Sequence, residues 1–349
     1  IESELNISLE RLEKYADQAR PSYITKDNTD ANNPITDAGA TLGRVLFYDP
    51  SLSRTDSVSC SACHQQANAF SDQNIASFGI NGTTSRHSMR LINSRFSDER
   101  RFFWDERATS LEAQTTQPIQ DHIEMGFSGA DGDPSLADLI DKLAAIDRYP
   151  ALFTRAFGDS AITEARLQSA LAQFIRSIES FDAPYDVGRA NHRDNQDFDN
   201  FTVAENRGKR LFMAPPNDGG AGCAGCHRPP EFDIDPDTRN NGVINAIDGG
   251  TDLTNTRSPS LRDLVNPAGV LNGGLMHNGA FESLEAVIEH YNRIPEDNNR
   301  LDQRLRRPGG GLQRLNLSET QKADLVEFLK TLTGSAVYLD PCRSNPFAL

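Results

Sequence analysis

The chain contains the pattern Cys-x-x-Cys-His twice, and this pattern limits its fold more than any other feature. The copies occupy residues 60–64 (CSACH) and 223–227 (CAGCH). In each copy, two thiols can bond to the vinyl groups of a haem and the following imidazole can ligate its iron. A redox Cys-x-x-Cys pair or half of a zinc site is the alternative, but neither copy has the second ligand pair that zinc needs. We therefore predict two covalently bound haem c groups, held by Cys60, Cys63, His64, Cys223, Cys226 and His227.

An internal repeat surrounds the two motifs. Residues 42–47 (LGRVLF) precede the first motif, and residues 207–212 (RGKRLF) precede the second. Both segments resemble the opening helix of a small cytochrome. The tetrapeptide Ser-Leu-Glu-Ala begins six residues after Trp104 and again six residues after His277. This match predicts that Trp104 and His277 are counterparts in the two halves.

Each half closes with an amphipathic segment, at residues 172–178 (AQFIRSI) and 326–332 (VEFLKTL). Their apolar residues recur at three- and four-residue spacing, which predicts terminal helices. The polar segment 182–201 has no helical apolar stripe and is predicted to hold the domain junction. The rest is helix fragments joined by loops rich in Gly, Pro and Asn. We predict a mainly α fold with two cytochrome c-like haem domains, 1–190 and 191–349.

Composition limits the partners and the location of the chain. A formal net charge of -15 argues against nucleic acid or an anionic membrane as the main partner. No run of 18 apolar residues predicts a transmembrane helix, and the start lacks signal-peptide features, so we expect a mature form. Haem attachment of this type is carried out outside the cytoplasm by a haem c maturation machinery, so we predict the periplasm or the cell surface. Cys342 has no obvious partner.

Residues 103–108 (FWDERA) carry a more specific signal. With Ser-Leu-Glu after them, Gln114, and Glu-Met-Gly from Glu124, they resemble the signature of dihaem cytochrome c peroxidases and MauG. The resemblance extends over nearly the whole chain. In that family the Trp lies between the haems, and the Gln and Glu line the distal side of the N-terminal haem. The resemblance therefore implies these roles for Trp104, Gln114 and Glu124, with hydrogen peroxide as the substrate.

The residue types suit this chemistry. Iron held only by His64 leaves one face open, where Glu124 can move a proton between the peroxide oxygens as their bond breaks. Gln114 can orient peroxide by a hydrogen bond. Trp104, the single Trp of the chain, has an indole that is easily oxidised and can relay electrons. Without the resemblance, a buried core Trp and a solvated helix Glu would be the simpler interpretations.

The first departure from the peroxidase pattern concerns the N-terminal haem. The family's second His, about sixteen residues after the first motif, is replaced by Ile80. His87 instead occupies the place of an Asn that helps bind calcium between the domains. Either His87 is an unusual distal ligand or this haem is permanently open, and we favour the open haem. Asn272 and Gly274 replace the family's Thr and Pro at the calcium site. Because such contacts resemble backbone carbonyl ligation, calcium near His87, Asn272 and Gly274 is retained as a prediction.

The second departure concerns the C-terminal haem. In the peroxidase branch, a Met fourteen residues after the His of a His-Asp-Gly segment is the sixth ligand. Here the segment begins at His277, and fourteen residues further on is Tyr291, as in MauG. A thioether favours ferrous iron, whereas a phenolate favours ferric and higher states. Tyr291 is the predicted ligand, and the alternatives are His290, Met276 and Met213.

These features predict a peroxide-dependent dihaem oxidase of the MauG type. In this hypothesis a high-valent two-haem state, shared through Trp104, oxidises a Trp or Tyr of a protein partner at long range. MauG's surface Trp before the second motif is replaced by Ala221, so charge must leave by another route. One branch of relatives acts with copper-acquisition proteins, and the chain is compatible with it. The alternatives are a cytochrome c peroxidase supplied by a small cytochrome or cupredoxin, and a non-enzymatic dihaem electron carrier or redox sensor.

Overall fold

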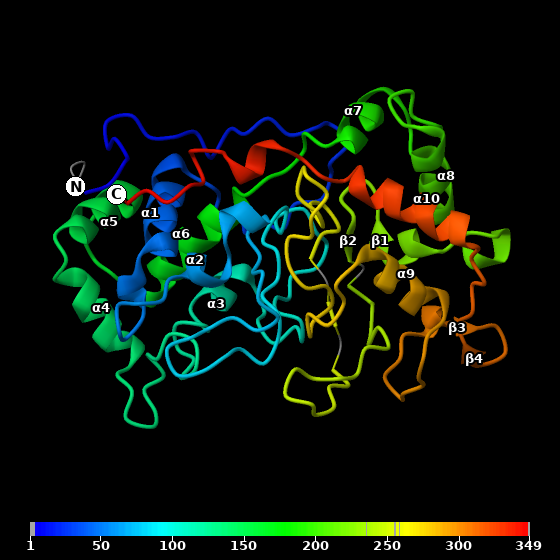
Figure 1. Ribbon diagram of the computed structural model, residues 1–349. Helices are drawn as coiled ribbons and strands as arrows, with labels where there is room; N and C mark the ends of the chain where they lie inside the picture. Colours follow the sequence, from blue (N-terminus) through cyan, green and yellow to red (C-terminus); the bar gives the residue numbers. More distant parts are fainter. Residues whose placement is uncertain (1–3, 235, 255, 258, 348–349) are drawn as a thin grey trace.

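The computed structural model describes residues 4–234, 236–254, 256–257 and 259–347, and it is mainly helical with long connecting loops (Figure 1). This confirms the predicted fold class. The helices are α1 (Asp37–Tyr48), α2 (Cys60–Cys63), α3 (Leu111–Thr115), α4 (Leu136–Ala144), α5 (Arg148–Phe157), α6 (Glu164–Arg176), α7 (Pro184–Asn191), α8 (Val203–Met213), α9 (Leu284–Asn292) and α10 (Glu319–Lys330). Two antiparallel pairs of very short strands complete it, β1 (His227–Arg228) with β2 (Asp233–Ile234) and β3 (Arg306–Arg307) with β4 (Gly311–Leu312). None of the helices in these ranges is long and apolar enough to cross a membrane.

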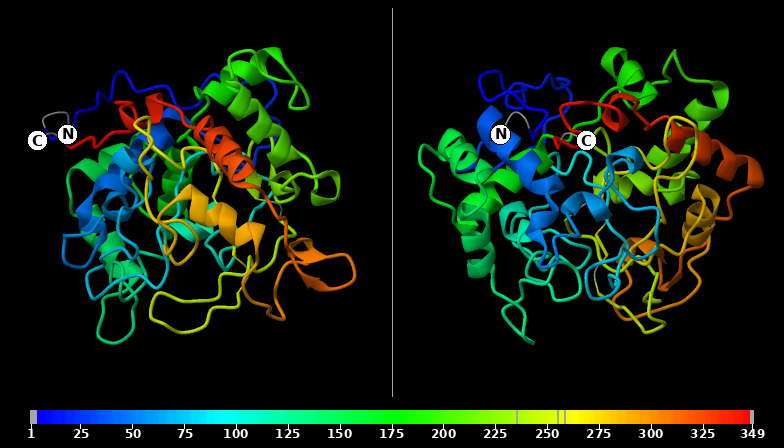
Figure 2. Two further views of the ribbon diagram at one scale, coloured as in Figure 1. Left: turned by 45° about the vertical axis from the view of Figure 1, so that its right-hand side comes forward. Right: turned by 60° about the vertical axis from the view of Figure 1, so that its left-hand side comes forward.

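The internal repeat is present in three dimensions. In the first half α1 packs on α6, and in the second half α8 packs on α10 (Figure 2). Both opening helices begin with a Thr cap, because Thr36 Oγ1 accepts from the Gly39 amide at 3.0 Å and Thr202 Oγ1 accepts from the Glu205 amide at 3.2 Å. The predicted opening and terminal helices of each half are therefore confirmed.

A glycine makes each of these helix crossings possible. A Cβ atom on Gly43 would overlap the Ala170 carbonyl oxygen, and one on Gly208 would overlap the Asp324 carbonyl oxygen. The backbones meet at these points, so no other side chain fits without moving a helix. Gly43 and Gly208 occupy the same position in the two copies of the repeat.

Gly208→Ala is expected to lower the free energy of unfolding of the haem-loaded protein by about 1–3 kcal/mol, because the added methyl forces α8 away from α10. The better helix propensity of Ala offsets at most about 1 kcal/mol of this loss. Thermal or urea unfolding followed by circular dichroism measures the change. Gly311→Ala is the matched control, since a Cβ there meets no atom within 4 Å. Equal stability of the two variants would contradict this account of the crossing.

The junction between the halves contains a helix that the sequence pattern does not predict. Helix α7 begins at Pro184, and the Asp186 carboxylate accepts a hydrogen bond from the Ala183 amide at 3.1 Å. Tyr185 is buried in the second core, and Arg262 forms a two-pronged ion pair with Asp186 at 2.8 and 2.9 Å. The buried Tyr185 ring and the buried Arg262–Asp186 ion pair anchor this helix, and the Tyr23 hydroxyl adds a hydrogen bond to Asp186 at 2.8 Å. The helix therefore forms without an apolar stripe, and the lack of a stripe in segment 182–201 did not indicate a lack of helix.

The two larger hydrophobic cores correspond to the two halves, but the C-terminal segment returns to the first one. Val337 is buried in the first core, and the Tyr48 hydroxyl donates to the Arg343 carbonyl at 2.7 Å. The Arg44 guanidinium donates to the Ser344 carbonyl at 2.7 Å. Both chain ends lie on the side of the first half (Figure 1). The predicted boundary at 190/191 stays a prediction. The C-terminal segment around Val337 follows the second half in the sequence but packs in the core of the first.

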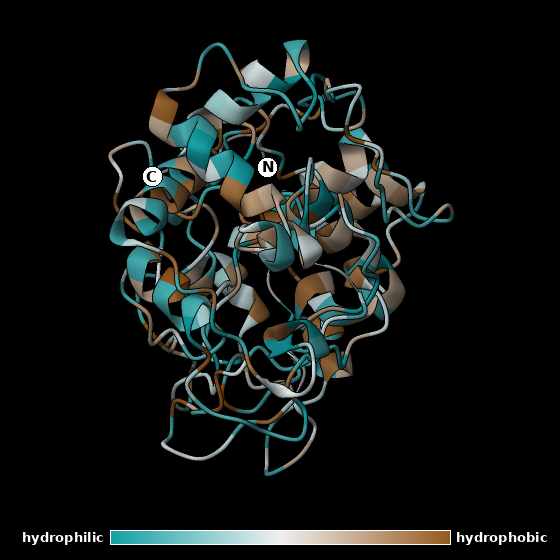
Figure 3. Cartoon of the chain, turned by 90° about the vertical axis from the view of Figure 1, so that its right-hand side faces the viewer, coloured by the Kyte–Doolittle hydropathy of each residue, from teal (hydrophilic) through white to brown (hydrophobic). Residues whose placement is uncertain are grey.

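Polar and apolar residues alternate along the helices. Figure 3 shows brown, apolar residues and teal, polar residues mixed on the same helices. This is the pattern of helices with one buried and one exposed face. Buried faces of these helices and the loops between them together build the walls of the functional sites.

Candidate haem sites

A cavity of about 560 Å³ surrounds the first Cys-x-x-Cys-His motif. The predicted site residues of this half all line it: Cys60, Cys63, His64, Trp104, Gln114 and Glu124. The His64 Nδ1–H donates to the Phe70 carbonyl at 3.1 Å, which orients the ring and leaves Nε2 as the atom available for iron. The structure thus gathers side chains from three separated segments around one space.

Glu124 has the electrostatics of an acid–base residue. Burial raises the pKa of its carboxyl to about 7, the negative charge of Asp121 adds to this, and Arg107 opposes it. Its backbone is fixed, because the Glu124 amide donates to Asp121 Oδ1 at 3.0 Å. A carboxyl with this pKa can both give and take a proton near neutral pH.

Gln114 lies on α3, which begins where the Ser110 hydroxyl accepts from the Ala113 amide at 3.1 Å. Arg107 also lines this cavity, with its guanidinium 3.5 Å from the Phe103 ring centroid and 2.9 Å from Asp105. Sequence reasoning included Arg107 in the signature but gave it no role. The charge pattern Asp105-x-Arg107 in the sequence could have indicated that the two side chains form an ion pair.

A second cavity of about 600 Å³ surrounds the second motif. Cys223, Cys226 and His227 line it, with a 3₁₀ turn over Cys223–Gly225 presenting the thiols. Burial lowers the pKa of His227 to about 4, so the imidazole is held in the neutral form that ligates metals. Its Nδ1 is buried without a hydrogen-bond partner among the described residues. Two thiols, an imidazole and a mainly apolar cavity in each half fit a covalently bound haem.

The candidates for sixth ligand separate into two groups. Tyr291, Met213 and Met276 line the second cavity. His290 turns away from it, because its Nε2–H donates to the Asn241 carbonyl at 2.9 Å. His290 and Tyr291 are neighbours on helix α9, so their side chains point in different directions. The helix begins at Ser283, whose hydroxyl accepts a hydrogen bond from the Ala286 amide at 3.1 Å. Tyr291 stays the predicted ligand, and burial raises the pKa of its phenol.

Trp104 lies between the two cavities and lines both. Its Nε1–H donates to the His87 carbonyl at 2.7 Å, and its side chain packs edge-on against the His277 ring, with centroids 6.3 Å apart. The predicted counterparts of the repeat thus face each other. We call the residues that line both cavities the shared wall: His87, Ser88, Met89, Arg90, Trp104 and Pro259.

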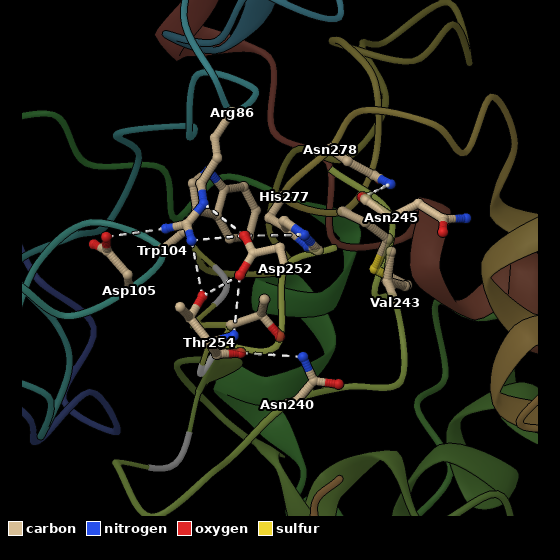
Figure 4. A network of polar contacts seen from close by, with 12 residues as sticks. Arg86, Trp104, Asp105, Asn240, Val243, Asn245, Asp252, Thr254, His277 and Asn278 are labelled. Atoms are coloured by element: carbon tan, nitrogen blue, oxygen red, sulfur yellow. Dashed lines mark hydrogen bonds and ion pairs between the residues drawn. The ribbon is translucent and has the colours of Figure 1, made fainter. Parts of the chain in front are cut away.

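His277 lies behind Trp104 rather than in a cavity wall. It is buried and lines neither cavity, and its Nε2 lies 3.6 Å from Asp252 Oδ2. Arg86 binds that carboxylate at 2.6 Å and Asp105 at 3.2 Å, so a polar network surrounds the indole (Figure 4). Burial lowers the pKa of His277 to about 4. Its predicted part in cofactor binding stays a prediction, and its observed contact is with Trp104.

His87 has protein partners on both ring nitrogens. Its Nδ1–H donates to the Asn74 carbonyl at 3.0 Å, and Nε2 lies 3.3 Å from the Ser71 hydroxyl oxygen. This arrangement favours the open N-terminal haem over a haem ligated by His87. Asn272 is buried with its Oδ1 unpartnered among the described residues, and Gly274 lines the second cavity.

The described part of the chain has no cluster of three His, Cys, Asp or Glu residues suited to a metal ion. Calcium binds oxygen atoms, including backbone carbonyls, which do not belong to such clusters. Calcium near His87, Asn272 and Gly274 therefore stays a prediction. Ala221 is buried and lines the second cavity, so it offers no aromatic ring at the surface.

Two haem-sized cavities on Cys-x-x-Cys-His motifs, with one Trp between them and an acid–base carboxyl in one, define a dihaem c-type cytochrome with a peroxide site. The family model described as di-haem cytochrome c peroxidase matches residues 37–194. The chain belongs to this family, which includes MauG. It is therefore an oxidoreductase that acts on peroxide, and the family implies two haem c groups. This membership disfavours the carrier and sensor alternative.

The similar proteins cover most of the chain. The chain is 31% identical over 315 residues to the methylamine utilization protein MauG of Methylophilus methylotrophus, covering 88% of this chain and 85% of that protein. For MauG of Methylorubrum extorquens the identity is 33% over 312 residues, covering 86% and 79%. Among solved structures, a MauG-like protein associated with microbial copper homeostasis is 28% identical, with a TM-score of 0.74 and coverage of 95% and 99%.

Proposed function

We propose that the protein is a MauG-type oxidase that uses hydrogen peroxide to oxidise a Trp or Tyr side chain of a protein partner. The observation that carries this proposal is the position of Tyr291, which lines the C-terminal cavity together with both thiols of the second motif. A phenolate oxygen is a hard anionic ligand that favours ferric and higher oxidation states. This ligation suits a site that stores oxidising power.

The chain's own residues support the peroxide step. Haem, when bound, supplies the redox chemistry of both sites. The Glu124 carboxylate accepts a proton from one peroxide oxygen and returns it to the other, which its pKa of about 7 allows near neutral pH. Gln114 orients the peroxide from the same cavity. Trp104 provides the indole through which the two sites exchange electrons.

Peroxide added to the fully oxidised protein tests this function. We expect new visible and near-infrared absorption that involves both haems, formed without prior reduction and lost when an oxidisable Trp or Tyr peptide is added. The same experiment with protein reduced at one haem is the comparison. Reaction only after half-reduction would contradict the proposal and favour a peroxidase.

Met276 favours that second candidate function, a cytochrome c peroxidase supplied by a small cytochrome or cupredoxin. Its thioether lines the C-terminal cavity, and its sulfur accepts a hydrogen bond from Asn241 Nδ2 at 3.5 Å. A thioether ligand would raise the reduction potential and suit the collection of electrons. Identifying the sixth ligand of the C-terminal haem, a phenolate or a thioether, therefore distinguishes the oxidase from the peroxidase.

The partner and the location follow from chemistry and likeness. The net charge of -15 favours a basic or neutral protein partner. The similar MauG-like structure is associated with copper homeostasis, so a copper-acquisition protein is the partner class we propose to test first. Covalent haem attachment supports a place in the periplasm or at the cell surface, which cell fractionation followed by haem staining tests.

A further inference from the structure

Arg90 is a buried cation in the shared wall. Its side chain is 8% exposed and lines both cavities. One guanidinium nitrogen, Nη2, donates to the Ser260 carbonyl at 3.2 Å, whereas Nε is buried without a hydrogen-bond partner among the described residues. Burial lowers the pKa of Arg90 to about 10, and the charge of Asp263 opposes this without an ion pair. Among the described residues, the Ser260 carbonyl is thus the one hydrogen-bond acceptor of the Arg90 side chain.

Three other guanidinium groups that line the cavities are paired with carboxylates. Arg86 binds Asp252 at 2.6 Å, Arg257 binds Glu99 at 2.9 Å and Arg304 binds Asp302 at 3.0 Å. A buried cation without a counter-ion is strongly unfavourable. The contrast indicates that the anion for Arg90 comes from the group that fills the cavities.

We propose that Arg90 binds propionate carboxylates of both haems across the shared wall. Propionates are the anionic groups of a haem, and a planar guanidinium with five N–H donors can bind carboxylates on two sides. The motif thiols hold the vinyl groups, so a second anchor on the propionates would fix the orientation of each ring. This inference goes beyond the proposed function, because it holds whichever substrate is oxidised.

The two reduction potentials of the resting, haem-loaded protein test this inference. Loss of a positive charge beside a propionate favours ferric iron. In Arg90→Gln, we therefore expect the ferrous-to-ferric ratio at a fixed electrode potential to fall about tenfold at both haems, or about 59 mV for a one-electron couple. Arg90→Lys keeps the charge and is expected to shift both potentials less, which keeps the test usable if the Gln variant loads haem poorly. Spectroelectrochemical titration measures both values.

Arg155→Gln is the matched control, because it removes the same charge at an exposed position that lines neither cavity. It should leave both potentials unchanged. Unchanged potentials in Arg90→Gln would overturn the proposal and leave Arg90 as a distant partner of Asp263. A shift at one haem alone would overturn the shared role. No peroxide is used, so these outcomes are independent of the oxidase proposal.

Discussion

Glu124→Gln is expected to slow the reaction of the oxidised protein with peroxide by about 10²–10⁴-fold, the range for loss of a general acid–base group. The amide is close in size to the carboxyl but cannot accept and return the proton. Stopped-flow absorbance under excess peroxide gives the second-order rate constant. Both haems should remain bound, because Glu124 is not part of either Cys-x-x-Cys-His motif.

The pH dependence of this rate gives a second measurement. The pKa of Glu124 is raised from 4.5 to about 7, so the carboxylate that accepts the proton forms only as the pH rises through about 7. The rate should therefore increase across this range in the unmodified protein and be flat in Glu124→Gln. Glu10→Gln, at an exposed position, is the control with the same change of charge. Equal rates in all three proteins would remove the acid–base role.

Tyr291→Phe is expected to change the visible spectrum of the C-terminal haem, because the phenolate ligand is lost. It is also expected to abolish the two-haem absorption formed with peroxide. The substitution removes only the phenol oxygen, so the partly buried ring still fills its place on α9. Electronic absorption and electron paramagnetic resonance of the oxidised protein detect the lost ligand. The N-terminal haem should keep its own spectrum.

Met276→Leu is the matched variant for that experiment. It removes the other ligand type from the same cavity with little change of volume. An unchanged spectrum in Tyr291→Phe with a changed spectrum in Met276→Leu would assign the thioether as the ligand. That outcome would also move the proposed function to a plain peroxidase.

The sequence predicted the parts of the molecule that depend on local spacing. Serine caps start α3 and α9 at the repeated tetrapeptide, and the side chains of the two motifs line the two cavities. Caps and motif geometry depend on neighbours along the chain, so they can be read from it. The repeat also predicted that Trp104 and His277 are counterparts, although not that their rings meet.

Features that depend on distant segments were not predictable. Helix α7 depends on the pairing of Asp186 with Arg262, and Arg90 shares the wall between the cavities with Pro259, which lies far away in the sequence. The contact between the rings of His277 and Trp104 likewise joins segments that lie far apart in the sequence. A sequence pattern does not show which buried charges find partners, since that is decided by tertiary packing.

The return of the segment around Val337 to the first core links the stability of the two halves. Val337 completes the core of the first half, yet it follows α10, which packs in the second half. The first core is therefore incomplete without residues that lie beyond the second half along the chain. We expect the two halves to unfold together rather than as independent units, because the first core is not built from one continuous stretch of sequence.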